Sequence, residues 1–169
     1  MSKPRIIAGT AKGRFLETPT RGTRPSPSRL REALFNILQS RARGTFLDLF
    51  SGSGAIGLEA ASRGWEVTCI DLSKEATRVI RQNAKNLRLN PTIIQGDALK
   101  FVEATKEHFD IVFAAPPYPL DLLPLFSTLY KSDIANELFI FQHPTTLELS
   151  FPTSETRVYG SNALTFIQR

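Results

Sequence analysis

The chain has 169 residues, 41% of them hydrophobic, which suits one compact domain with an appendage and excludes two full domains. Cys69 is the single cysteine and the two histidines, His108 and His143, are isolated, so neither a disulfide nor a cysteine zinc site can form, and no metal is expected. No apolar run approaches the length of a membrane span, and the N-terminus lacks the apolar core of a signal peptide. These features predict a soluble cytoplasmic protein.

The formal net charge of +5 is distributed unevenly along the chain. Residues 1–45 contain ten Lys or Arg and two acids, whereas residues 46–169 contain eleven bases and fourteen acids. Eight of the ten early bases are arginines, and the planar guanidinium group binds phosphate through paired hydrogen bonds. The asymmetry favours contact between the first segment and a nucleic-acid backbone over a merely solvated basic face.

The N-terminal segment is predicted to form a hairpin, a loop and a helix. Residues 5–18 contain a glycine-bearing turn between two short apolar stretches, and the Pro- and Gly-rich residues 18–25 predict a loop. Ser26 is predicted to cap the helix, with Pro27 at its first position. The apolar stripe of this helix consists of Leu30, Ala33, Leu34, Ile37 and Leu38. Because Arg29 and Arg31 lie away from the centre of the stripe, they are expected to face outward.

A strand, a glycine turn and a helix follow one another from residue 46. Residues 46–50 are apolar except for Asp48, which indicates a buried parallel strand. Gly52, Gly54 and Gly57 then have the G-x-G-x-x-G spacing, directly before a helix-forming stretch. This context favours a ligand at the helix N-terminus, because glycine permits close approach and the first helical amides are free. The alternative is a tight turn without a ligand.

Two later acids come at the ends of predicted strands. Asp71 ends the apolar run 67–70, and Asp97 follows residues 93–96. Together with Asp48, these acids are expected at one edge of a parallel sheet, where open α/β folds bind their ligands. Asp71 is suited to accept hydrogen bonds from ribose hydroxyls. The arrangement favours a nucleoside with a positively charged tail, S-adenosylmethionine, over a nicotinamide dinucleotide.

Strands and helices alternate through the rest of the chain. Strands are predicted at 65–70, 92–95, 109–114 and 137–142, helices at 73–87, 98–105 and 121–130, and short antiparallel strands at 147–149, 156–159 and 163–167. Repeated βα units predict an α/β fold with an open, mostly parallel sheet and helices on both faces.

A proline-rich loop follows the predicted strand 109–114. It begins at Ala115, Pro116 and Pro117, and its carbonyl groups are free to point toward a ligand. Tyr118 offers an aromatic face on which a base can stack. The alternative is an ordinary proline turn, but its position beside the glycine loop favours a functional interpretation.

Several motifs together identify a family. They are residues 5–9, 23–25, 29–38, 47–54, 96–98 and 116–118, and they extend over nearly the whole chain. With these motifs the sequence resembles the bacterial RsmD-like S-adenosylmethionine-dependent methyltransferases, which modify the exocyclic N2 of a guanine in 16S ribosomal RNA. The first three motifs separate this family from other amino-methyltransferases.

The resemblance implies a Rossmann-like class I methyltransferase fold, with a seven-stranded sheet and a small N-terminal hairpin and helix. Residues 1–44 would be an RNA-binding extension and residues 45–169 the methyltransferase domain. The implied cofactor is S-adenosylmethionine, and the implied partner is 16S rRNA within the small subunit or its assembly intermediate. A monomer is expected.

Site residues follow from the resemblance and from the charge distribution. The cofactor contacts are expected to be Asp48, Phe50, Ser51, Gly52, Gly54, Asp71, Leu72, Asp97 and Ala98, with residues 48–54 at the methionine part, Asp71 at the ribose and residues 97–98 at the adenine. The target amine is expected beside Ala115, Pro116 and Pro117, with Tyr118 stacked on the flipped-out base. The expected RNA contacts are Arg5, Lys12, Arg14, Arg24, Arg29 and Arg31.

One departure from the family pattern concerns the reaction itself. The family carries Asp or Asn before Pro-Pro-Tyr, whereas this chain carries Ala115, which has no acceptor. A positioned proton acceptor contributes roughly 10² to 10⁴ in rate. Three interpretations remain: a slow enzyme that uses the Pro116 carbonyl and water, a binding protein with little activity, or a change introduced at Ala115.

Two further functions are disfavoured. A DNA amino-methyltransferase would need a separate target-recognition domain, for which 169 residues leave no room. A nicotinamide oxidoreductase would need a substrate domain and a hydride-acceptor site, and neither is present in the sequence.

Overall fold

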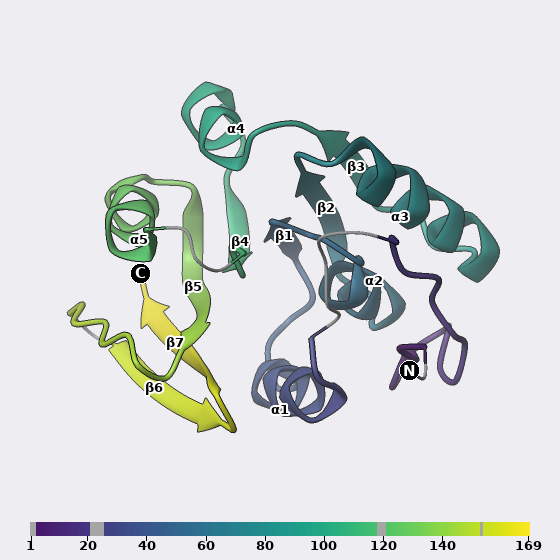
Figure 1. The fold of residues 1–169 in the computed structure, drawn as a ribbon, viewed down its shortest axis with the longest axis horizontal. Coiled ribbons are helices and arrows are strands. Elements are labelled where there is room, and N and C mark those ends of the chain that lie inside the picture. The colour runs from purple at the N-terminus through teal and green to yellow at the C-terminus, as the bar shows by residue number, and fades with distance from the viewer. Residues whose placement is uncertain (1–2, 21–25, 118–120, 153) are drawn as a thin grey trace.

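The computed structural model describes residues 3–20, 26–117, 121–152 and 154–169, and is organised around a seven-stranded sheet (Figure 1). The strands are β1 (Thr45–Leu49), β2 (Glu66–Asp71), β3 (Thr92–Gln95), β4 (Phe109–Ala114), β5 (Ala135–Pro144), β6 (Ser154–Tyr159) and β7 (Asn162–Gln168). Their order is β3-β2-β1-β4-β5-β7-β6. The first five in this order are parallel, and β7 and β6 are added antiparallel.

Helices cover both faces of the sheet. They are α1 (Ser28–Leu38), α2 (Ala55–Ser62), α3 (Lys74–Leu87), α4 (Ala98–Ala104) and α5 (Leu122–Lys131). Apolar residues of α1, α2 and α3 form one core with one face of the sheet, and those of α4 and α5 form a second core with the other face. Figure 1 shows the two groups of helices apart, with α4 and α5 at the upper left. This is the Rossmann-like α/β fold that the sequence predicts.

The alternation of side chains along β1 explains why its sequence is almost wholly apolar. Phe46 and Leu47 pack in opposite cores, because successive side chains of a strand point to opposite faces of the sheet. A central parallel strand is covered on both faces, so every position needs an apolar residue unless the polar group has a partner inside. Asp48 is the one polar residue among the four buried positions of β1, and it lies under α2.

The N-terminal segment packs into the same core as the sheet. Ile6 and Leu16 are fully buried with Leu34 and Phe35 of α1 in the first core. The predicted hairpin is present in residues 3–20 as a short antiparallel pairing around the Arg5–Phe15 bridge, in which the Ile6 amide donates to the Arg14 carbonyl and the Leu16 amide to the Pro4 carbonyl, each at 2.9 Å. This arm and α1 are therefore part of the packed body, and a separate RNA-binding role for residues 1–44 remains a prediction.

Two local predictions are wrong. Pro27 is the N-cap of α1, without a side-chain hydrogen bond, so Ser26 does not cap the helix. Residues 147–149 form no strand, because β5 continues to Pro144 and a turn follows; Leu147 and Leu149 pack against the second core instead.

The predicted cap of α3 is confirmed. The Ser73 hydroxyl accepts a hydrogen bond from the amide of Ala76 at 3.1 Å, which satisfies one of the free donors of the first turn. Among the described residues, no helix is long and apolar enough to cross a membrane.

Candidate cofactor and substrate site

The glycine loop between β1 and α2 has a backbone that favours glycine. Gly52 and Gly54 have φ angles of 57° and 81°, in the left-handed region where a side chain is disfavoured. Phe50 also lies there, with a φ of 60°, which costs roughly 1–2 kcal/mol for a residue with a Cβ atom. The strained Phe50 and the two glycines turn the chain sharply at the carboxyl end of β1.

Hydrogen bonds fix this loop to the end of β2. The Ser51 amide donates to the Ile70 carbonyl at 2.8 Å, and the Ser51 hydroxyl accepts from the Ile70 amide at 3.0 Å. The Gly52 amide donates to Asp71 Oδ2 at 2.7 Å, and Asp71 Oδ1 accepts from the Ser73 amide at 2.9 Å. Each carboxylate oxygen has lone-pair capacity beyond these bonds, so Asp71 can also accept hydrogen bonds from a ribose.

Gly57 lets α2 lie close to the sheet. A Cβ atom at this position would lie 2.5 Å from Cys69 Sγ and 3.0 Å from Asp48 Oδ2. The Gly57 amide donates to Asp48 Oδ2 at 3.0 Å. The third glycine of the spacing therefore serves helix–sheet packing, which fixes the direction in which α2 leaves the loop.

Asp48 is a buried carboxyl group beneath this helix. It is 1% exposed, and burial raises its pKa to about 7, opposed by hydrogen bonds from Gly57 and Ser51. The charge of Asp71 raises the pKa further. These contacts make Asp48 an anchor that joins the glycine loop and α2 to the end of β1.

The expected adenine residues lie at the same edge of the sheet. Asp71 is in register with Gln95, and the Gly96 amide donates to the Asp71 carbonyl at 2.9 Å, which brings Asp97 to this edge. Asp97 caps α4 by accepting from the Lys100 amide at 2.9 Å, and Ala98 is buried. Leu72 is 70% exposed, so it offers apolar surface to a flat ring.

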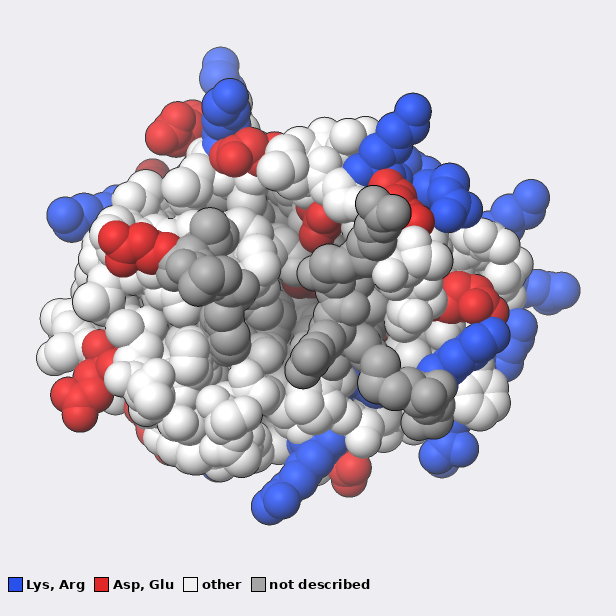
Figure 2. Space-filling view, in the orientation of Figure 1, with Lys and Arg blue, Asp and Glu red and all other residues white. Residues whose placement is uncertain are grey.

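The proline loop leaves the strand next to the glycine loop. Leu49 of β1 is in register with Ala114 of β4, so the segments that follow these two residues start side by side. Ala115 is half-buried, Pro116 is buried and Pro117 is exposed. Tyr118 lies outside the described residues. The methyl side chain of Ala115 cannot accept a proton, as the sequence already indicates. Figure 2 shows a hollow near the centre of this view, in which acidic atoms are visible.

Four of the expected RNA contacts are exposed: Arg5, Lys12, Arg14 and Arg29. Arg24 lies outside the described residues.

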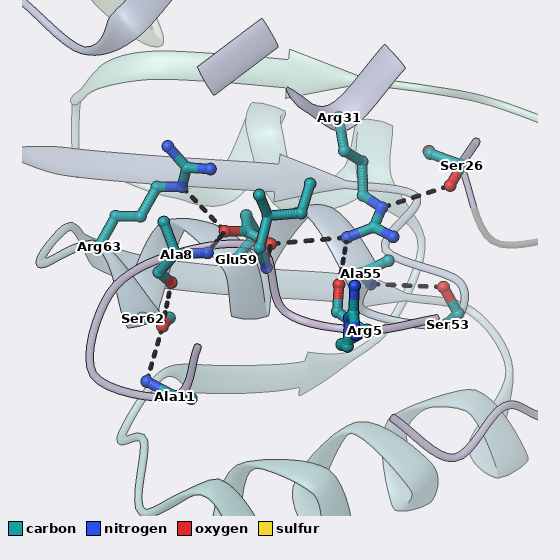
Figure 3. A network of polar contacts seen from close by, with 11 residues as sticks. Arg5, Ala8, Ala11, Ser26, Arg31, Ser53, Ala55, Glu59, Ser62 and Arg63 are labelled. Atoms are coloured by element: carbon teal, nitrogen blue, oxygen red, sulfur yellow. Dashed lines mark hydrogen bonds and ion pairs between the residues drawn. The ribbon is translucent and has the colours of Figure 1, made fainter. Parts of the chain in front are cut away.

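The expectation that Arg31 faces outward is wrong. It is 2% exposed, and its guanidinium group donates to the Arg5 carbonyl at 3.1 Å and forms an ion pair with Glu59 at 3.5 Å (Figure 3). Burial lowers the pKa of Arg31, and the charge of Glu59 opposes this. Arg31 holds α1 against α2 and is not available to an RNA phosphate.

Glu59 is a central residue that the sequence analysis missed. Its carboxylate is fully buried and accepts hydrogen bonds from the amides of Ile7 and Ala8 at 2.8 and 3.1 Å, as well as from Arg63 at 2.8 Å (Figure 3). The one feature of the sequence that could have indicated this role is an acid within the otherwise apolar start of α2. Its partners lie far away in the sequence, so the pattern could not name them.

In the part of the chain that the structure describes, no three His, Cys, Asp or Glu residues come close enough to hold a metal ion.

Comparison with known proteins finds a family model and relatives that match most of the chain. A family model described as "Conserved hypothetical protein 95" matches residues 4–168. A putative rRNA methyltransferase, YlbH of Bacillus subtilis (strain 168), is 31% identical over 156 residues, covering 86% of this chain and 85% of the relative. Ribosomal RNA small subunit methyltransferase D of Escherichia coli (strain K12) is 34% identical over 143 residues, with 81% and 72% covered.

Solved structures agree with this fold. A hypothetical protein of Thermus thermophilus superposes with a TM-score of 0.92 at 43% identity, covering 98% of this chain and 99% of that one. The putative methyltransferase YhhF of Escherichia coli has a TM-score of 0.85 at 29% identity, with 99% and 98% covered. A Thermus thermophilus 16S rRNA N2 methyltransferase, solved with AdoMet and guanosine, shares only the fold, with a TM-score of 0.73 at 21% identity over 89% of this chain and 44% of that one.

Proposed function

We propose a methyl-transfer function for this chain, which belongs to the Conserved hypothetical protein 95 family of RsmD-like methyltransferases. The cofactor is S-adenosylmethionine and the substrate is ribosomal RNA. More specifically, we propose that the acceptor is the exocyclic N2 of a guanine in 16S rRNA, within the small subunit or its assembly intermediate. The chain would act as a monomer in the cytoplasm, where this substrate is assembled.

The observation that carries the proposal is the pairing of two loops at one edge of the sheet. The glycine loop is bound to Asp71 at the end of β2, and the Ala115–Pro117 segment leaves the neighbouring β4. A sulfonium nucleoside fits these groups, because Asp71 can accept from ribose hydroxyls while exposed Leu72 offers apolar surface to adenine. The loop at Gly52 and Gly54 leaves backbone accessible to the methionine part.

The chemistry requires alignment and removal of one proton. S-adenosylmethionine supplies, when bound, a methyl group on a sulfonium, whose sulfur keeps the electron pair of the broken bond. The Pro116 carbonyl accepts a hydrogen bond from the guanine amine and aligns its nitrogen, while Tyr118 stacks on the base. Because Ala115 offers no acceptor, water takes the proton that nitrogen loses. We expect a slow enzyme for this reason.

The proposal is tested by transfer of labelled methyl to small subunits that lack the modification, followed by identification of the modified nucleoside. We expect slow formation of N2-methylguanosine by the wild-type chain. Ala115→Asp should increase the rate by up to roughly 10² to 10⁴, the contribution of a positioned proton acceptor. Absence of transfer by the wild-type chain, both to subunits and to free rRNA, would overturn the proposal.

A second candidate is a non-catalytic protein that binds RNA and cofactor on the same fold. Ala115 is the observation that favours it, because the family's acceptor is missing. Saturable binding of S-adenosylmethionine and rRNA without transfer by the wild-type chain, and transfer after Ala115→Asp, would establish this alternative.

A further inference from the structure

A stripe of basic residues runs along the outer side of α3. Its members, called here the α3 stripe, are Lys74, Arg78, Arg81, Lys85 and the C-cap Arg88. They are spaced by four, three, four and three residues, which places them on one side of a helix. All five are exposed, while the opposite side of α3 buries residues such as Ala76 and Ile80 in the first core. At 1.5 Å per residue the stripe extends over about 21 Å.

The N-terminal arm runs beside this helix in the opposite direction. Three hydrogen-bonded pairs hold it there, which are Arg14 with Asn86, Glu17 with Asn83 and Thr20 with Glu75. Arg14 Nη2 donates to the Asn86 carbonyl at 3.2 Å, so an arm arginine lies at the C-terminal end of the α3 stripe. The arm and the helix therefore form one continuous surface.

Positive charge is concentrated on this side of the molecule. Residues 3–20 and 74–88 together carry nine bases and two acids, whereas all other residues carry twelve bases and fourteen acids. Figure 2 shows Lys and Arg side chains gathered along the right-hand edge, where Figure 1 places α3 and the arm. Within the described ranges, no member of the α3 stripe forms an ion pair.

The position of the stripe connects it to the proposed site. Lys74 follows Asp71 by three residues, so the first end of the stripe lies at the carboxyl edge of the sheet, beside the expected ribose position. The other end points away from this edge along the first face of the sheet. A polyanion that reaches the site can therefore follow the helix over several turns, which a small phosphorylated metabolite cannot do.

We propose that the α3 stripe, together with Arg14, binds the phosphate backbone of the rRNA on one side of the base to be modified. This inference rests on the proposed function, because rRNA is the polyanion that the site would act on. Contacts of this kind position the nucleic acid and carry little sequence information, so they should strengthen binding of rRNA without selecting the guanine.

The test compares two charge-matched triple variants of the full chain. The first is Lys74→Gln, Arg78→Gln and Lys85→Gln, whose side chains make no hydrogen bond among the described residues. The control is Lys106→Gln, Lys131→Gln and Arg157→Gln, which removes the same charge elsewhere on the surface. Binding of a small-subunit rRNA fragment is measured at several salt concentrations, together with the affinity for S-adenosylmethionine and the methyl-transfer rate.

We expect weaker rRNA binding by the α3 variant and a decrease of about 2 to 3 in the slope of log K against log salt, at roughly 0.7 to 0.9 per lost phosphate contact. KM for rRNA should rise while kcat and cofactor affinity stay unchanged. The control should behave as wild type. Equal slopes in the two variants would overturn the inference.

The two proposals can fail separately. If the wild-type chain binds rRNA but transfers no methyl group, the proposed function fails, and the salt slopes still decide the role of the α3 stripe. If it methylates rRNA and the α3 variant retains the wild-type slope and KM, only the inference is overturned. If it binds no rRNA at any salt concentration, both are overturned.

Discussion

Asp48 is a carboxyl group that is almost wholly shielded from water. An unfolded aspartate titrates near pH 3.9, whereas burial raises the pKa of Asp48 to about 7. Between about pH 4 and pH 7, the folded chain therefore keeps a proton that the unfolded chain has lost. Since stability falls with rising pH wherever the folded state binds more protons, this carboxyl group favours folding most below pH 4 and loses that contribution up to pH 7.

We predict that Asp48→Asn removes this part of the pH dependence. The amide stays neutral and its oxygen can still accept from the Gly57 amide. The free energy of unfolding of wild type minus that of the variant should decrease from pH 4 to pH 7, by about 1.4 kcal/mol for each unit of pKa difference. Denaturant unfolding at a series of pH values measures it. A difference that does not vary with pH would contradict a buried, protonated Asp48.

A second prediction at this scale concerns Gly57. Gly57→Ala should destabilise the fold by roughly 1–3 kcal/mol, because the new methyl group would press on Cys69 and Asp48. Cys69→Ala in the same chain should restore part of this loss. Gly96→Ala is the matched control, since a Cβ atom there meets nothing within 4 Å. Thermal unfolding of the wild type, the two single glycine variants and the double variant measures these changes in stability. Equal losses at Gly57 and Gly96 would refute close packing of α2 against the sheet.

At the scale of elements, the arm, α1 and α2 are joined through one buried carboxylate. Glu59 of α2 accepts from the arm backbone at Ile7 and Ala8 and pairs with Arg31 of α1. Breaking a buried pair by removing one partner leaves an uncompensated buried charge, which is strongly destabilising. The exposed basic surface of the arm therefore depends on an interior contact.

We predict that Glu59→Gln destabilises the protein by about 3–5 kcal/mol, the usual effect of leaving a buried partner unpaired. Amide hydrogen exchange at Ile7 and Ala8 should become faster, since the amide side chain offers one acceptor oxygen in place of two. Glu137→Gln is the control, because its pair with Arg41 is half exposed and worth about 0–1 kcal/mol. Similar stability losses in both variants would argue against Glu59 as the buried carboxylate that joins the arm to α1 and α2.

The same elements show how far the sequence could predict the fold. Buried parallel strands such as β3 and β4 are short apolar runs bounded by turn residues, and the predicted bounds of both are confirmed. The strand predicted at 147–149 was wrong, because Leu147 and Leu149 pack against the second core instead of pairing with another strand. The burial of Arg31 depends on Glu59, 28 residues further along the chain, and helical periodicity carries no information about that partner.

At the scale of the whole molecule, the loops of the proposed site and the start of the basic surface lie at one edge of the sheet. The loop after β1 is hydrogen-bonded to the end of β2 at the carboxyl edge, the segment after the neighbouring β4 starts beside that loop, and α3 begins at the same edge. The sequence predicted this edge, because parallel strands end together and their acids and glycines could be read directly. It did not predict that the arm runs along α3, since those hydrogen bonds join residues more than 50 positions apart.

The most direct test of the account is a calorimetric titration of the full chain with S-adenosylmethionine. The wild-type chain and the control Asp133→Asn, a carboxylate before β5, should bind one equivalent with equal affinity. Asp71→Asn should bind roughly 10- to 100-fold more weakly, because hydrogen bonds to a charged acceptor contribute about 1.5–3 kcal/mol. Absence of binding by the wild-type chain, or equal affinity in Asp71→Asn, would contradict a cofactor site at the carboxyl edge of the sheet.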